Sequence, residues 1–145
     1  MAGSGTGSLT TAEVLRCSAS AFSAWPGSWP SFCPGFDVLV TPIINQEYGL
    51  FFSDGSVIVT GRLVDQLTNL SNGNSITVNA SGPARVSDDG TTVTLLGETL
   101  IADMGGFRYP GSPPDTELVS GRVVLGATGI VSETGQIRDL CTELA

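Results

Sequence analysis

The chain has 145 residues and a net charge of −8, with six basic residues, all of them arginine, and neither lysine nor histidine. These absences exclude a Ser-His-Asp triad, a histidine-ligated zinc ion, a Schiff-base lysine and a phosphate-binding lysine. The negative charge argues against nucleic acid and membrane surfaces as partners. A hydrophobic share of 41% predicts a folded domain with its own core.

The first 36 residues are predicted to form an N-terminal region in three parts. Residues 1–8 are rich in Gly and Ser and are expected to be a flexible arm. A short helix is predicted from Thr10 to about Arg16 or Ala21, followed by a loop rich in Trp and Pro. The arm has neither a positive nor an apolar segment, so no secretory signal is expected, and no apolar run is long enough to span a membrane.

From residue 37 the apolar side chains recur at every second position, which predicts a single β domain over 37–145. Pro42 is expected to end the first strand or to place it at a sheet edge. The tail from Gln136 to Leu144 has Ile137, Leu140, Cys141 and Leu144 at helical spacing, which predicts a short terminal helix. The expected strands are 38–40, 48–52, 57–65, 75–80, 85–87, 92–96 with an extension to 102, 118–125 and 130–134.

Turn residues separate these strands at short intervals. Asn72-Gly73 predicts a type I′ hairpin turn, and Asp88-Asp89-Gly90 predicts a type I turn that closes on a left-handed glycine. The pattern as a whole predicts an all-β fold, an antiparallel sandwich or barrel of about 7–9 short strands with short helical turns at both ends.

The three cysteines, Cys17, Cys33 and Cys141, allow three pairings that each leave one thiol free. Two alternatives follow. All three can be buried as small apolar side chains, or Cys33 and Cys141 can pair. A bridge between Cys33 and Cys141 would close a loop of about 100 residues and stabilise the folded state by up to roughly 4.7 kcal/mol on chain-entropy grounds. It would suit an extracellular or virion-surface setting.

Several short motifs between Cys33 and the C-terminus resemble those of a loosely defined group of small, mostly secreted actinobacterial proteins of unknown function. The resemblance implies a β domain and supports the pairing of Cys33 with Cys141; it implies no activity. The chain departs from the group by lacking a signal sequence and by carrying Cys17. A phage of such a host that carries this domain on its particle would explain both departures. The motifs are Cys33-Pro34-Gly35-Phe36-Asp37-Val38, Leu67-Thr68-Asn69, Ser75-Ile76-Thr77-Val78-Asn79, Ser81-Gly82-Pro83, Ser120-Gly121-Arg122-Val123-Val124 and Gly135-Gln136-Ile137-Arg138-Asp139-Leu140-Cys141.

Two loops concentrate aromatic side chains and are the candidate partner-binding sites. The first carries Trp25, Trp29 and Phe32 among prolines. It is either a recognition surface or a lid that buries both tryptophans over the β domain. The second loop, over 103–116, carries Phe107, Arg108 and Tyr109, a composition typical of interface hot spots, or else it is a solvated connection. These six residues are the predicted contact residues.

The carboxylates suggest neither a metal site nor a catalytic pair. Asp54, Asp88, Asp89 and Asp103 lack the alternating spacing of a calcium loop, so turn formation explains them. No carboxylate pair stands out for acid–base chemistry. We therefore expect no catalytic residues, no cofactor and no metal.

The sequence predicts a non-catalytic structural or interaction protein that assembles with copies of itself or on a larger particle, such as a phage capsid decoration or tail accessory protein. The alternative is a secreted β-sandwich module that binds glycan or protein through the aromatic loops. The expected location is the virion or the extracellular space.

Overall fold

The computed structural model describes residues 12–13 and 32–145 and forms one antiparallel sheet with a small C-terminal helix. The strand order is β1-β2-β3-β5-β6-β7-β8, and β4 pairs with β3. The all-β prediction is confirmed. Of its two forms the barrel is wrong, because the described strands run in a path with two ends. The bounds are β1 Ala12–Glu13, β2 Val38–Phe51, β3 Val57–Asn69, β4 Ser75–Asn79, β5 Ala84–Val86, β6 Val93–Asp103, β7 Asp115–Gly126, β8 Gly129–Asp139 and α2 Leu140–Leu144.

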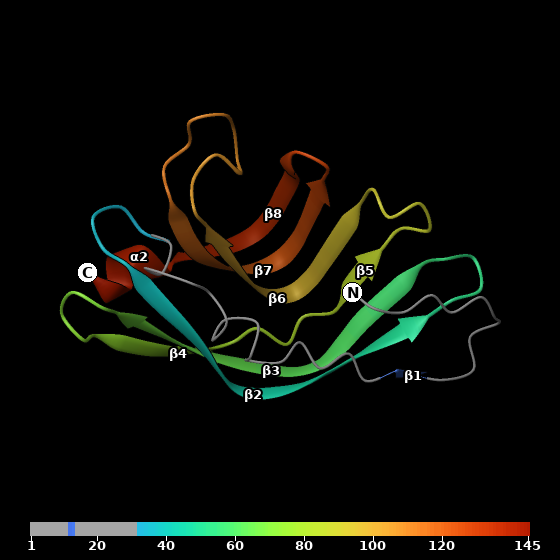
Figure 1. Ribbon diagram of the computed structural model, residues 1–145, viewed down its shortest axis with the longest axis horizontal. Helices are drawn as coiled ribbons and strands as arrows, with labels where there is room; N and C mark the ends of the chain where they lie inside the picture. The colour runs from blue at the N-terminus through green and yellow to red at the C-terminus, as the bar shows by residue number, and fades with distance from the viewer. Residues whose placement is uncertain (1–11, 14–31) are drawn as a thin grey trace, which may run out of the picture.

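The sheet folds back on itself into two layers (Figure 1). The strands β2, β3 and β4 form one layer, β6, β7 and β8 form the other, and the short β5 connects β3 to β6. Five of the strands have 11 to 14 residues, so they are longer than the short strands that the sequence predicted. Long strands allow the sheet to fold into two layers, since a long strand can bend along its length.

Pro42 does not end a strand, which corrects the expectation of two separate strands over 38–52. The strand β2 is continuous, and the register shifts between Pro42 and Ile44. A bulge of this kind accommodates proline because one residue leaves the regular ladder of hydrogen bonds. Among the described residues β2 has β3 as its one neighbour at Pro42, so the alternative expectation, a strand at a sheet edge, is confirmed there.

The two predicted hairpin turns have different outcomes. Between β5 and β6, Gly90 has the expected positive φ of 72°, and its amide donates to the Ser87 carbonyl at 2.9 Å. Between β3 and β4 the type I′ prediction is wrong. Asn69 and Asn74 close a four-residue loop, in which only Gly73 has a positive φ. The Asn72 side chain bonds the backbone amide of Asn74, as a turn residue in an ordinary backbone region does.

The two ends of the chain also differ from their predicted helices. Ala12 and Glu13 pair with β2 as strand β1, so the predicted N-terminal helix does not include them; the rest of that helix lies outside the described residues. The C-terminal helix is confirmed but begins only at Leu140, because residues up to Asp139 pair with β7. Asp139 caps it by accepting a bond from the Thr142 amide at 3.2 Å.

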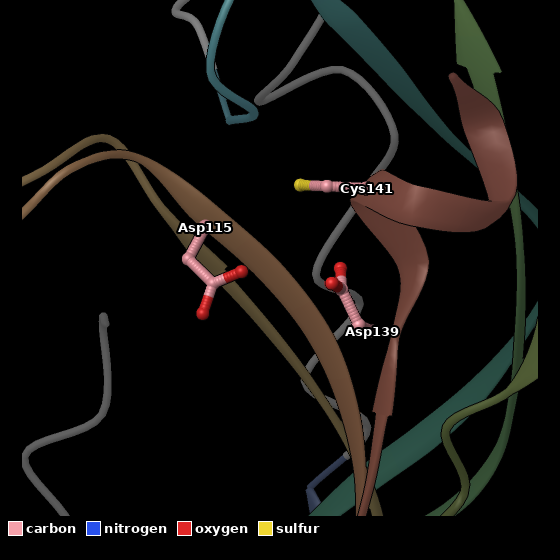
Figure 2. A group of neighbouring side chains, drawn as sticks. All are labelled: Asp115, Asp139 and Cys141. Carbon is pink, nitrogen blue, oxygen red and sulfur yellow. The ribbon is translucent and has the colours of Figure 1, made fainter.

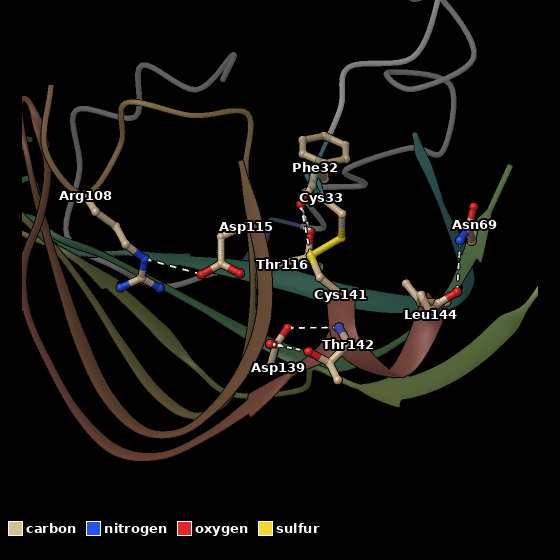
Figure 3. Close-up of a disulfide and its surroundings, with 10 residues drawn as sticks. All are labelled: Phe32, Cys33, Asn69, Arg108, Asp115, Thr116, Asp139, Cys141, Thr142 and Leu144. Atoms are coloured by element: carbon tan, nitrogen blue, oxygen red, sulfur yellow. Dashed lines mark hydrogen bonds and ion pairs between the residues drawn. A yellow bond between two sulfur atoms is a disulfide. The ribbon is translucent and has the colours of Figure 1, made fainter. Parts of the chain in front are cut away.

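The larger hydrophobic core lies between the two layers and beside α2. Its buried members are Phe32, Cys33, Val38, Val40, Leu67, Val78, Leu118, Leu140, Cys141 and Leu144. The Cys33–Cys141 disulfide, with a Cα–Cα distance of 5.5 Å, joins the start of the described domain to α2 and confirms the predicted pair (Figure 3). Hydrogen bonds from Thr116 to the Phe32 carbonyl and from Asn69 to the Leu144 carbonyl tie the same ends to β7 and β3.

A row of three glycines crosses the upper layer. Gly121 on β7 pairs with Gly97 on β6 and with Gly135 on β8. A Cβ atom on Gly121 would overlap the Thr134 carbonyl oxygen and would lie 2.8 Å from the Gly135 Cα. Glycines are therefore required where β7 and β8 approach each other this closely, and such a row lets a sheet bend sharply. Figure 1 shows these strands curling upward along their length.

Candidate functional site

The loop over residues 104–114, which connects β6 to β7, is folded on itself and against β8. The Gly105 amide donates to the Asp103 carboxylate at 2.7 Å, and the Gly106 amide donates to the Ser112 carbonyl at 2.9 Å. The Ile130 amide donates to the Phe107 carbonyl at 3.2 Å. These bonds hold the loop across the curl of β7 and β8.

Arg108 extends from this loop to three carboxylates. Its Nη1 lies 2.6 Å from Glu133 Oε2 on β8, its Nη2 pairs with Glu117 Oε1 on β7, and its Nε lies 3.6 Å from Asp115 Oδ2. The side chains of Glu117 and Glu133 are buried. The two carboxylates lie on opposite sides of the bend at Gly121, since Glu117 is four residues before Gly121 on β7 and Glu133 pairs with Val123, two residues after it. The bend therefore brings both carboxylates to one guanidinium.

Arg108, Glu117 and Glu133 shift one another's pKa values. Burial, together with a hydrogen bond to Glu133, raises the pKa of Glu117 to about 7. Burial also acts to raise the pKa of Glu133, but hydrogen bonds from Glu117 and Arg108 leave it lowered. The bond to Glu133 raises the pKa of Arg108. One proton on Glu117 leaves one carboxylate facing one guanidinium, so the buried part of the cluster is balanced.

The ion pairs of the cluster join the 104–114 loop to β7 and β8. One oxygen of each of the three carboxylates contacts Arg108, and Glu133 Oε1 is buried without a hydrogen-bond partner among the described residues. Charge-assisted bonds in such surroundings are strong and directional. We conclude that Arg108 fixes the loop to the sheet.

Beside the loop lies an open groove of about 440 Å³ that reaches α2. Its apolar wall comes from Phe36, Tyr109, Pro113 and Pro114, and its acidic wall comes from Asp115 and Asp139. Tyr109 is 59% exposed. The groove therefore combines an exposed aromatic ring with carboxylates that can accept hydrogen bonds.

Asp115, Asp139 and Cys141 lie close together at this groove, with ligand atoms within 4.8 Å of one another (Figure 2). The Cys141 sulfur is bonded to Cys33, so it supplies no thiolate to a metal. Asp139 is used by the helix cap, since the Thr142 hydroxyl donates to it at 2.6 Å. The group has fewer free oxygen ligands than the 6–8 that Ca²⁺ takes. It belongs to the acidic wall of the groove.

The structure places the predicted contact residues very differently from one another. Tyr109 is exposed and Phe107 is half-buried, while Arg108 points back into the ion pairs. Phe32 is buried in the interlayer core. Trp25, Trp29 and Cys17 lie outside the described residues, so the predictions about them stay as they were.

Sequence reasoning missed the carboxylates that hold Arg108 and line the groove. Glu117 carried a weak signal, because it is a charged residue directly before the apolar pair Leu118 and Val119. Glu133 carried none, since it sits in a strand of mixed polarity and acquires its role only through the bend. The turn carboxylates behave as predicted: Asp54 and Asp89 accept bonds from neighbouring Ser and Thr.

Comparisons with protein families, with characterised proteins and with solved structures found no match to this chain. The resemblance to small actinobacterial β proteins therefore stays a prediction. In the part of the chain that the structure describes, no helix has the length and apolar character needed to cross a bilayer. The disulfide is compatible with an extracellular protein.

Proposed function

We propose that the chain is a non-catalytic interaction protein that assembles with copies of itself or on a larger particle, with the groove and the 104–114 loop as the contact surface. A phage capsid or tail is the concrete form of that particle, and the virion is then its location. The observation that supports the proposal is Tyr109, exposed on a loop that Arg108 fixes by three ion pairs. An aromatic residue on a loop that is already held in place loses little backbone conformational entropy on binding.

The edge of β8 supports the same proposal. Among the described strands β8 pairs with β7 alone, so its outer edge can accept another strand. It exposes two large apolar side chains, Val131 at 70% and Ile137 at 54%. Asp139, at the end of this strand, is part of the groove. Edge and groove thus form a continuous surface.

The test is light scattering after size exclusion, over a range of concentrations, on the wild type and on Tyr109→Ala. If Tyr109 is a hot spot, its loss weakens assembly by about thirtyfold, since such truncations cost 2 kcal/mol or more. Tyr48→Ala removes the other exposed tyrosine, which is 37% exposed on β2, and should leave assembly unchanged. Tyr109→Ala should retain the thermal stability of the wild type. A protein that is monomeric at all concentrations, or an unaltered Tyr109→Ala assembly, argues against self-association through this surface.

A second candidate is a secreted module that binds glycan at the same groove. It is favoured by the position of Tyr109 beside Asp115 and Asp139, because aromatic rings stack on sugars and carboxylates accept bonds from hydroxyls. A glycan panel measured by calorimetry tests it. Binding by the monomer that is lost in both Tyr109→Ala and Asp115→Asn would favour this candidate over assembly.

A further inference from the structure

A separate cavity of about 520 Å³ lies between the two layers, away from the groove. Leu63 on β3 and Leu100 on β6 give it apolar walls. Two carboxylates, Glu47 on β2 and Asp65 on β3, line the same cavity. Its volume is in the range of about 300–1,000 Å³ that is usual for small-molecule sites.

Strand pairing places both carboxylates on one face of the β2–β3 layer. Glu47 is opposite Gly61, and side chains two and four residues further along β3, at Leu63 and Asp65, point to the same side. Asn45, opposite Leu63, also lines the cavity, and it turns its side-chain oxygen to the Glu47 amide. The acidic side chains are thus directed into the cavity by the register of the hairpin.

Asp65 is the unusual group at this site. It is only 4% exposed, yet no residue that the structure describes forms a hydrogen bond or ion pair with its carboxylate. An ionised carboxylate out of water needs a partner, because removal from water without compensation is very costly. Burial accordingly raises the pKa of Asp65, and burial together with repulsion from Asp65 raises the pKa of Glu47.

We propose that this cavity binds a small organic cation, with an ammonium group between Asp65 and Glu47 and an apolar body against Leu63 and Leu100. The cation supplies the missing partner of a buried carboxylate, and the leucines supply apolar contact area. This site is independent of the contact surface proposed above.

The walls favour an organic cation over a metal ion. Calcium takes 6–8 oxygen ligands and magnesium retains several waters. Here two carboxylates face leucine side chains, and the Asn45 oxygen is already engaged with the Glu47 amide. Such surroundings complete the coordination of neither metal, whereas an alkylammonium group needs few acceptors and gains from an apolar wall.

The experiment compares 2-phenylethylammonium with 2-phenylethanol, a neutral probe of nearly the same shape, by calorimetry and amide NMR at neutral pH. The wild type should bind the ammonium probe at least tenfold more tightly than the alcohol. Asp65→Asn should reduce this preference by tenfold or more. Asp88→Asn is the matched control, since it removes one negative charge from an exposed turn and should change nothing.

Each other outcome counts against the proposal. Equal binding of the two probes, no binding of the ammonium probe, or unchanged binding by Asp65→Asn would overturn it. Displacement of the ammonium probe by Ca²⁺ would assign the site to a metal instead. Circular dichroism and thermal unfolding establish that Asp65→Asn is folded. Should it not fold, Glu47→Gln serves as the second variant: it is expected to weaken ammonium binding, and wild-type affinity in it would also overturn the proposal.

Discussion

Neighbouring residues on β6 and β7 face two different interiors. Leu100 and Leu118 pack into the core between the layers, whereas Ile101 and Val119, the next residue on each strand, pack into a smaller cluster under the 104–114 loop. Successive side chains on a strand point to opposite faces, so the upper layer has apolar side chains on both of them.

The two faces are closed by different means. The first is covered by a second sheet layer and by α2, and a disulfide joins its ends. The second, as far as the described residues go, is covered by a loop, which the three ion pairs of Arg108 hold to the curled strands. Extensive apolar burial is enough to hold a whole layer in place. A short loop over a small cluster needs directional charged contacts as well, and here these form because glycines let the strands bend.

The largest expected effect comes from breaking the first face with Cys33→Ala and Cys141→Ala together. A bridge with a sequence separation of 108 closes a long loop, and losing it should lower the free energy of unfolding by about 4–5 kcal/mol. Urea denaturation measures the loss. Reductant should destabilise the wild type by a similar amount and leave the double variant unchanged. A double variant as stable as the oxidised wild type would contradict this assignment of stability.

The bend of the second face is tested by Gly121→Ala. The added methyl group would collide with the backbone of β8, so we expect a loss of roughly 3 kcal/mol, at the upper end for overpacking. Gly73→Ala is the control. Gly73, unlike Gly121, has a positive φ, of 79°, but it has open space around its Cβ position, so the cost should be about 1 kcal/mol. Equal losses in the two variants would show that close approach of β7 and β8 is not the constraint.

Arg108→Gln removes the charge that closes the second face. Breaking a fully buried ion pair costs about 3–5 kcal/mol, and since the Arg108 side chain is 26% exposed we expect about 2 kcal/mol. Arg138→Gln breaks the exposed pair with Glu143, which measures 2.9 Å, and should cost less than about 1 kcal/mol. Thermal unfolding of both variants makes the comparison. A similar cost for both would mean that the Arg108 cluster contributes no more than a surface pair.

The smallest effect is a pH dependence. The pKa of Glu117 is about 7 in the folded protein and 4.5 ordinarily, so the folded state retains a proton that the unfolded state releases. Raising the pH from about 4.5 to 7 should therefore lower the free energy of unfolding. The opposite shift of Glu133 offsets part of this. Urea denaturation across that pH range should show that the free energy of unfolding changes less steeply with pH in Glu117→Gln than in the wild type. Stability that rises with pH there in the wild type would contradict the assignment.

Local patterns in the sequence determined much of this protein. Alternation of apolar residues predicted the β domain, the turn at Gly90 follows from its residue types, and the separation of Cys33 from Cys141 made their pairing attractive. These features depend on a residue and its near neighbours, or on the chain ends alone. The same local logic was half right at Pro42, where the strand continues but has β3 as its one described neighbour. It failed at Asn72, where the closure of a longer loop decided the backbone.

Tertiary structure alone decided where the charges meet. Arg108 was predicted as a contact residue from its place between Phe107 and Tyr109, but the bend at the glycine row brings Glu117 and Glu133 to it and leaves Tyr109 exposed. Nothing in the spacing of Glu47 and Asp65 indicates a shared cavity, because it exists only once the sheet folds back over them. Periodicity in a sequence sets which face of a strand a side chain occupies. Which faces meet depends on how the whole sheet bends, and that depends on contacts between residues far apart in the chain.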